Sequence, residues 1–220
     1  MISIMPDYAE RLKRAGTTAL SDALDRLGIA GQALGIMPVD RTMKFAGTAF
    51  TVRMLPVGMT GGSVGDYIDD VEPGKVVVID NDGNMGATVW GDILTWVASE
   101  RNIAGTVIDG VCRDSDRCVE LNYAVFARGN TMRTGKDRVT ADAYNVSVQI
   151  AGVRVNPDDW LAGDADGVVV IPADRIDEVL DLADVIEEAE AAIRKKVAQG
   201  LSLEQARREL NYHSLQMKQN

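Results

Sequence analysis

Histidine is nearly absent from this chain: its 220 residues include one, His213, in the polar C-terminal segment "NYHSLQMKQN". A single histidine, far from any glycine-rich turn, argues against Ser-His-Asp or Cys-His catalysis, histidine metal clusters and phosphohistidine transfer. The chemistry of the chain is therefore expected to depend on carboxylates, arginine and backbone dipoles, with a hard metal ion as a further option.

Cysteine is almost as scarce, with only Cys112 and Cys118 in the chain. Two cysteines without a nearby histidine cannot form a four-ligand zinc site. Cys112 beside Arg113 can be interpreted as a reactive thiol or as a small structural cysteine, and we favour the structural interpretation. Both thiols are expected to be reduced, as in a cytoplasmic protein.

Long apolar runs and an excess of positive charge are also missing. No run approaches the roughly 18 apolar residues that a membrane span needs. The N-terminal segment "MISIMPDYAERLKRAG" is charged too early to form the apolar region of a signal peptide. The net charge of −10 argues against nucleic acids and anionic membranes as partners. We therefore expect a cytoplasmic protein that binds neither.

Cofactor-binding motifs are lacking as well. Neither "GGSVGD" nor "GNMG" has the glycine spacing of a dinucleotide or phosphate loop, so no nucleotide cofactor is expected. The segment at 80–92 resembles a calcium loop, but Met85 replaces the required glycine and Gly91 the required glutamate. "DADG" at 164–167 runs into a β-branched segment, which is typical of a turn before a strand.

What the sequence does contain is the composition of an ordinary globular protein, with 46% hydrophobic and 25% charged residues. Its length suffices for a substantial core. Without repeats or linkers, we expect a single domain over residues 1–220. Its core is predicted at about 17–172, and C-terminal helices at about 173–212.

Hydrophobic periodicity predicts alternating strands and helices. Helices are predicted at 17–28, 91–102, 173–200 and after Ser202. Strands are predicted at 45–55, 74–80, 105–110 and 123–129, with an antiparallel ribbon at 146–157 and a turn and strand at 163–172. This order indicates the α/β class, with mixed sheets and helices packed outside them.

Polar residues gather where two predicted strands end. Residues 76–114 are predicted to form, in order, a strand, a glycine-containing loop, a helix, a second strand and an acidic turn. Ligands of α/β sheets bind at the carboxyl ends of strands, so the loop and the turn are expected to face one crevice. A helix that begins at Gly91 and Asp92 would present free N–H groups to a carboxylate or phosphate. Arg113 can clamp an anion, and Asp114 offers a hard oxygen ligand.

Each of these residues also has a purely structural interpretation. Asp92 can be a helix N-cap. Arg113 and Asp114 can form a surface ion pair, and Asp116 can be a solvated side chain. On the residues alone, an active site and a solvated turn remain equally open.

A resemblance favours the active site. The chain resembles the RraA-like family in the order and spacing of six segments: "LSDALDRLG", "AGTAFTV", "PGKVVVID", "ATVWGDILTWVASERNIAGTVIDGVCRD", "VFARG" and "GDADGVVVIP". This family holds the regulator of ribonuclease E activity and the class II 4-hydroxy-4-methyl-2-oxoglutarate and 4-carboxy-4-hydroxy-2-oxoadipate aldolases. The resemblance spans about residues 17–200, and its most specific part is the Gly-Asp helix followed by Asp-Gly-x-x-Arg-Asp. It implies a swivelling β/β/α domain in homotrimers or hexamers with active sites between subunits.

The activity that the resemblance implies is divalent-metal-dependent cleavage of 4-hydroxy-2-oxo acids to pyruvate. Oxaloacetate decarboxylation is implied as a side activity, because both reactions pass through a pyruvate enolate. By matching position, Asp114 would hold Mg²⁺ or Mn²⁺, partly through waters. Arg113 would contact the C2 oxygen as it becomes an enolate.

The remaining implied roles fall around the same helix. Gly91 and the amides of Ile93 and Leu94 would receive the substrate carboxylate. Asp92 would order the metal-bound water that shuttles the proton. Glu190 is the best candidate for an acidic residue that reaches a neighbouring subunit's site.

One position departs from the aldolase pattern. The aldolases usually carry a carboxylate three residues after the metal-binding aspartate, and this chain has Arg117 at that position. The difference concerns metal affinity and substrate range. Regulator-type members lack the aspartate that Asp114 supplies, so we favour the enzyme branch. The alternatives are a non-catalytic regulator of the ribonuclease E inhibitor type, with an acidic surface for a basic partner, and an enzyme of this fold acting on a sugar acid.

Overall fold

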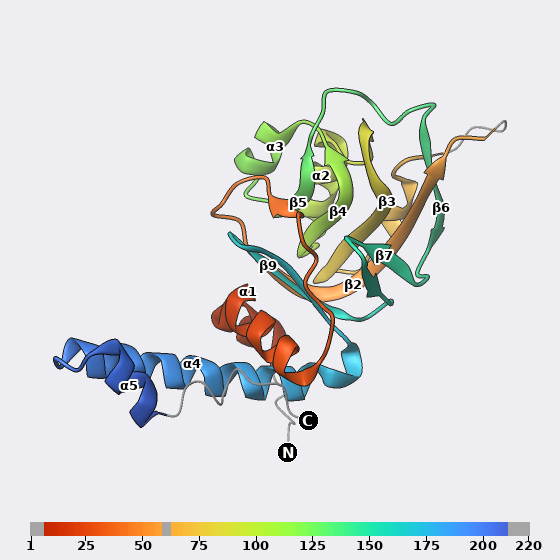
Figure 1. Ribbon diagram of the computed structural model, residues 1–220. Helices are drawn as coiled ribbons and strands as arrows, with labels where there is room; N and C mark the ends of the chain where they lie inside the picture. The colour runs from red at the N-terminus through yellow and green to blue at the C-terminus, as the bar shows by residue number, and fades with distance from the viewer. Residues whose placement is uncertain (1–6, 59–62, 211–220) are drawn as a thin grey trace, which may run out of the picture.

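A computed structural model of the chain describes residues 7–58 and 63–210 (Figure 1). Its centre is an eight-stranded sheet in the order β1-β5-β4-β3-β2-β9-β10, in which β6 also pairs with β2. The strands are β1 (Met37–Pro38), β2 (Phe45–Pro56), β3 (Lys75–Thr88), β4 (Gly105–Cys112), β5 (Val125–Asn130), β6 (Val139–Tyr144), β9 (Trp160–Asp164) and β10 (Gly167–Ile171). The predicted α/β class with a mixed sheet is confirmed.

The middle of the sheet is parallel and deeply buried. Strands β2, β3, β4 and β5 run parallel to one another, whereas β1, β6, β9 and β10 pair antiparallel with their neighbours. The continuous apolar run at 76–79 in β3 and the whole of β4 are buried, as expected of strands covered on both faces. Crossover helices α2 (Asp92–Glu100) and α3 (Ser115–Glu120) make the parallel connections from β3 through β4 to β5.

The remaining helices form a second layer. Figure 1 shows α1 (Tyr8–Leu27) and α4 (Ile176–Ala198) packed together beneath the β9 strand, at the opposite end of the molecule from α2 and α3. The second half of α4 extends past this body and carries α5 (Leu203–Glu209), which opens with the predicted Ser202 capping box. Among the described residues, no helix combines the length and apolar character that a membrane crossing requires. The last predicted helical residues, 211–212, and His213 lie outside the described residues.

Helix α1 is longer than the predicted 17–28 and has a break inside it. Gly16 has φ 73° and ψ 162°, which interrupts the helical backbone. The segment after the break is held at its start by Asp164, whose carboxylate accepts from the backbone N–H of Thr17 at 2.8 Å and from its hydroxyl at 2.6 Å. The helix ends at Gly28 with φ 68°, a left-handed cap that glycine adopts without strain.

The glycine-containing loop predicted after residue 80 is instead an irregular continuation of β3. Its pairing with β4 shifts register between Asp80 and Asn84 and again before Thr88. Asp82 and Gly83 supply positive φ angles of 52° and 65° at the first irregularity. The strand therefore carries the chain directly to the start of α2. The predicted ribbon is confirmed as β7 (Val148–Ile150) paired with β8 (Val153–Val155).

Asp109 belongs to the strand predicted at 105–110, and this prediction is confirmed. Asp109 lies within β4, and its side chain is only 8% exposed although it is charged. Its carboxylate pairs with the guanidinium of Arg128 on β5 and accepts from the backbone N–H of Ala151 at 2.7 Å. Asp80 on β3 similarly accepts from the N–H of Gln149 at 3.1 Å. These two carboxylates tie the β7–β8 hairpin to the central sheet.

We expect Asp109→Ala to destabilise the fold by about 3 kcal/mol, because removing one partner of a buried pair leaves the other charge uncompensated. The control is Asp116→Ala, which removes an exposed carboxylate on α3 and should change stability by at most about 0.5 kcal/mol. Urea unfolding followed by circular dichroism measures both. Equal stability of the two variants would contradict a structural role for Asp109.

Candidate active site

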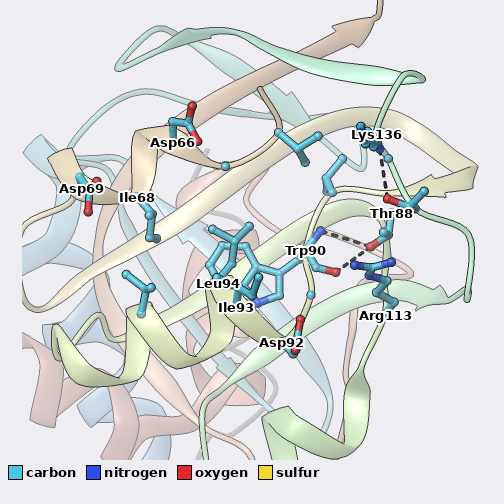
Figure 2. Close-up of a pocket in the computed structure, with 17 residues that line it drawn as sticks. Asp66, Ile68, Asp69, Thr88, Trp90, Asp92, Ile93, Leu94, Arg113 and Lys136 are labelled. Carbon is cyan, nitrogen blue, oxygen red and sulfur yellow. Dashed lines mark hydrogen bonds between the residues drawn. The ribbon is translucent and has the colours of Figure 1, made fainter. Parts of the chain in front are cut away.

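A pocket of about 410 Å³ opens at the N-terminal end of α2. It lies between the first turn of α2, the 3₁₀ helix η1 (Asp66–Asp70) and the segment at 134–136 (Figure 2). Four of the residues predicted to form a site line it, namely Gly91, Asp92, Ile93 and Leu94, together with Arg113 from the end of β4. The carboxyl ends of the adjacent parallel strands β3 and β4 thus lead to one cavity, as predicted.

The first turn of α2 presents unused hydrogen-bond donors to this pocket. Gly91 is the N-cap, with no side chain of its own to cap the helix, and Asp92 is the first helical residue, so the interpretation of Asp92 as the N-cap is wrong. The N–H of Asp92 donates to Asp114 Oδ2 at 3.1 Å. Among the described residues, the N–H groups of Ile93 and Leu94 have no acceptor. A carboxylate placed there would receive two hydrogen bonds and the positive end of the helix dipole.

Arg113 is fixed at the pocket wall by its backbone and by Asp114. Its N–H donates to the carbonyl oxygen of Trp90 at 3.0 Å, which joins the end of β4 to the residue before the N-cap. Its Nε lies 3.2 Å from Asp114 Oδ2. Within the described part of the chain, no acceptor occupies its two terminal nitrogens. These nitrogens form a planar donor pair that can bind an anion.

Asp114 adopts an uncommon backbone conformation that brings its carboxylate behind the helix start. Its φ of 54° lies in the left-handed region, which few residues other than glycine, asparagine and aspartate adopt. A Cβ atom at Gly91 would lie 2.9 Å from Asp114 Oδ2 and 3.1 Å from Arg113 Nε, so a larger residue would push these two side chains out of their present positions. The side chains of Arg113 and Asp114 are 38% and 39% exposed. They do form the surface ion pair considered from the sequence. Arg113 lines the pocket, whereas Asp114 is not among its lining residues.

The protein ligands available here suit a hard cation that keeps most of its water ligands better than a cation that the protein coordinates completely. In residues 7–58 and 63–210, no group of three or more acidic, histidine or cysteine side chains is arranged to hold a metal ion. Asp114 uses Oδ2 for Arg113 and for the Asp92 amide, which leaves Oδ1 for a ligand. One carboxylate oxygen fits Mg²⁺ or Mn²⁺, because these ions keep several waters in protein sites.

The two cysteines lie close to this site but face the interior. Both are free and buried. Burial raises the pKa of the Cys112 thiol to about 12 and also raises that of Cys118. Because the thiolate is the reactive form, these thiols are unreactive at neutral pH. The structural interpretation of Cys112 is therefore the one that its surroundings favour.

Several pocket residues have no counterpart among the sequence predictions. They are Asp66 and Asp69 on η1, Thr88 at the end of β3, and Thr134 and Lys136 before β6. The segments that carry them are short and polar, without the periodicity that marks a helix or strand. They come close to α2 only in the folded chain, and no local sequence motif predicts this contact.

Glu190 lies far from the pocket of its own chain. It is on the second half of α4, which extends away from the body that contains α2 (Figure 1). Its side chain is 34% exposed and pairs with Arg194 at 3.2 Å. A role for Glu190 in catalysis would therefore require the site of a neighbouring subunit.

Comparisons with known proteins agree with this architecture. A protein of Legionella pneumophila called DlpA is 40% identical over 211 residues, which are 94% of this chain and 34% of DlpA, so this chain spans about a third of that relative. A protein of Halalkalibacterium halodurans named "Putative 4-hydroxy-4-methyl-2-oxoglutarate aldolase" is 33% identical over 80% of this chain and 82% of its own length.

A solved structure extends the comparison to the fold. RraAS2 of Streptomyces coelicolor, described as an unusual member of the RNase ES inhibitor RraA protein family, matches with a TM-score of 0.81 and 28% identity, over 87% of this chain and 98% of that one. The family model described as RraA-like, Aldolase/RraA, matches residues 17–170. The chain therefore belongs to the RraA-like family.

Proposed function

We propose that this protein is a divalent-metal-dependent lyase that cleaves 4-hydroxy-2-oxo acids to pyruvate through an enolate, with oxaloacetate decarboxylation as a side activity. The observation that carries the proposal is that two free amides of α2 and the free guanidinium nitrogens of Arg113 face one pocket. The name of the Halalkalibacterium relative supports the aldolase branch of the family.

The substrate's 2-oxo acid end fits these donors. Its carboxylate binds the N–H groups of Ile93 and Leu94, and its C2 oxygen faces the terminal nitrogens of Arg113. When the C3–C4 bond breaks, its electron pair moves toward the C2 oxygen, and the positive charge of Arg113 stabilises the enolate that forms. Mg²⁺ or Mn²⁺ held by Asp114 would, when bound, add further positive charge at that oxygen.

Two proton transfers complete the reaction. The C4 hydroxyl must lose its proton as C4 becomes a carbonyl, and C3 of the enolate must gain a proton to give pyruvate. Asp92 is an exposed carboxylate that lines the pocket and can order the water that carries these protons. We also propose a homotrimer or hexamer, in which Glu190 of one subunit reaches the site of another.

A non-catalytic regulator is the second candidate, since the Streptomyces relative belongs to a family named for ribonuclease inhibition. The net charge of −10 suits a basic partner. Charge alone does not distinguish it from an enzyme, because acidic surfaces are common in soluble proteins. The arrangement of Asp114 behind Arg113 and Gly91 favours the lyase.

A screen of 4-hydroxy-2-oxo acids and oxaloacetate with pyruvate detection tests the proposal. We expect pyruvate release with Mg²⁺, loss of release after chelation and dialysis, and recovery when Mg²⁺ or Mn²⁺ is returned, because a single carboxylate holds such ions reversibly. Unchanged activity in excess chelator would show that the reaction does not need a divalent metal. No activity on any 2-oxo acid would favour the regulator.

A further inference from the structure

Trp90, the residue before the N-cap of α2, is tied to both strands that lead to the pocket. Its carbonyl oxygen accepts from Thr88 Oγ1 at 2.7 Å and from the N–H of Arg113 at 3.0 Å. Its own N–H donates to Thr88 Oγ1 at 3.2 Å, and dashed lines in Figure 2 mark the bonds between these two residues. The Trp90 backbone therefore joins the end of β3 to the residue after β4 at the point where α2 begins.

The Trp90 side chain reaches into helix α2. The residue is 1% exposed, and its ring stacks on Tyr123 with the ring centroids 6.1 Å apart. Its Nε1 lies 2.9 Å from Oγ1 of the buried Thr95, which in turn lies 2.9 Å from the carbonyl oxygen of Gly91. An indole N–H can only donate, so Thr95 Oγ1 accepts from Trp90 and gives its single proton to Gly91. The other neighbour of this hydroxyl, Cys118 Sγ at 3.5 Å, is a weaker acceptor.

The peptide unit between Gly91 and Asp92 is held at both of its edges. Its carbonyl accepts from Thr95 twice, from the backbone N–H at 3.0 Å and from the hydroxyl at 2.9 Å. Its N–H donates to Asp114 Oδ2 at 3.1 Å, and the same oxygen pairs with Arg113 Nε. A rotation of this peptide unit would break the contact with Asp114 and turn the first helical amides relative to Arg113.

Helix stability alone gives little reason for a threonine at position 95. Threonine is a poorer helix former than alanine or leucine, and a hydroxyl bonded to the carbonyl four residues earlier slightly destabilises a helix. The hydroxyl does satisfy the buried indole N–H of Trp90. It also holds the one peptide unit that connects the helix start to the Arg113–Asp114 pair.

We propose that Thr95 is a positioning residue for enolate formation. Its hydroxyl, oriented by the indole of Trp90, fixes the peptide unit after Gly91 and thereby sets the spacing between the free α2 amides and the guanidinium of Arg113. Thr95 does not itself line the pocket, so it acts through the groups that touch the substrate. This inference rests on the proposed lyase function and specifies what keeps its binding groups in place.

The test removes the hydroxyl while keeping the shape of the side chain. Thr95→Val should lower kcat for oxaloacetate decarboxylation, and the rate of exchange of the methyl protons of pyruvate in D₂O, by about 10- to 100-fold, because a misplacement of about 1 Å can cost on the order of 10²-fold. KM should change little, since both amides still receive a carboxylate. Thr95→Ser keeps the hydroxyl and should keep most of the turnover.

Thr51→Val is the matched control. Thr51 is also fully buried, and its hydroxyl donates to the carbonyl of Val146 at 2.6 Å, but it does not line the pocket and makes no contact with α2. Both substitutions leave a buried polar group without its partner, so both should lower the melting temperature. Only Thr95→Val should slow turnover.

A second background separates positioning from stability. Trp90→Phe keeps an aromatic ring but has no indole N–H to satisfy, so adding Thr95→Val should lower the melting temperature less there than in wild type. If the Thr95 hydroxyl positions the Gly91 peptide, the same addition should still lower kcat by at least about 10-fold. If the hydroxyl serves stability alone, the loss of turnover should shrink together with the loss of stability.

The outcomes separate this inference from the function on which it rests. If wild type with Mg²⁺ catalyses neither exchange nor decarboxylation, the lyase proposal fails, and the role of Thr95 fails with it. If wild type is active but Thr95→Val keeps its kcat, or Thr51→Val loses as much turnover, or Thr95→Ser is as slow as Thr95→Val, the role of Thr95 alone is overturned.

Discussion

Arg113→Lys should lower turnover by at least 10²–10³-fold, the usual cost of removing one electrostatic stabiliser of a developing oxyanion. Lysine keeps the positive charge but loses the planar pair of donors. In the structure, Nε faces Asp114 at 3.2 Å while the terminal nitrogens remain available to a ligand. The single ammonium group of lysine cannot pair with Asp114 and bind a ligand in the pocket with the same geometry. The measurement is kcat and KM for aldol cleavage and oxaloacetate decarboxylation, with and without Mg²⁺.

The stability of the same variant provides the control. If Arg113 belongs only to a solvated ion pair, its replacement should change stability by at most about 0.5 kcal/mol and leave activity untouched. We expect the small change in stability together with the large loss of turnover. An Arg113→Lys variant with wild-type kcat on both substrates would contradict its role at the C2 oxygen.

Asp114→Asn should lose metal-dependent turnover by a comparable factor, at least about 10²-fold. The amide is nearly the same size as the carboxylate, so an oxygen can still accept from the Asp92 N–H, as Oδ2 now does at 3.1 Å. The negative charge that attracts Mg²⁺ and pairs with Arg113 is lost. Asparagine also tolerates the left-handed φ of 54° at this position. Fold and oligomer should therefore survive the substitution.

A metal titration distinguishes this effect from a general loss of activity. Wild-type activity should saturate with Mg²⁺, whereas Asp114→Asn should stay inactive or require far more metal. Asp116→Asn is the matched control, because it removes a nearby exposed carboxylate on α3 and leaves intact the Asp114 carboxylate that pairs with Arg113. Identical Mg²⁺ dependence of wild type and Asp114→Asn would exclude Asp114 as the metal-binding residue.

The part of the site that was predictable from sequence is the part with a local signal. The first turn of α2 follows a continuous apolar strand, and Arg113 and Asp114 follow the next one. Because parallel neighbours end at the same edge of a sheet, their polar termini were expected to meet. The structure places the first turn of α2 and Arg113 on one pocket. Asp114 lies beside them and bonds to Arg113 and the Asp92 amide, and Gly91 permits this close approach. Their catalytic roles remain predictions.

The parts that could not be predicted depend on partners distant in the chain. Asp109 is charged although it lies in a predicted buried strand, and its burial is tolerable because of Arg128 on another strand and the Ala151 amide, which no local pattern indicates. The break in α1 is stabilised by Asp164, which lies 147 residues beyond Thr17. Lys136 reaches the pocket through the packing of its segment on β3. None of these contacts leaves a periodic pattern in the sequence.

The measurement that tests the central claim most directly is exchange of the methyl protons of pyruvate in D₂O, followed by NMR. It detects the enolate itself and requires no knowledge of the second half of the substrate. We predict Mg²⁺-dependent exchange by the wild-type protein that is lost in Arg113→Lys and in Asp114→Asn, with unchanged melting temperatures. Exchange no faster than with Mg²⁺ and buffer alone, or equal exchange by all three proteins, would contradict an enolate-forming site at the N-terminus of α2.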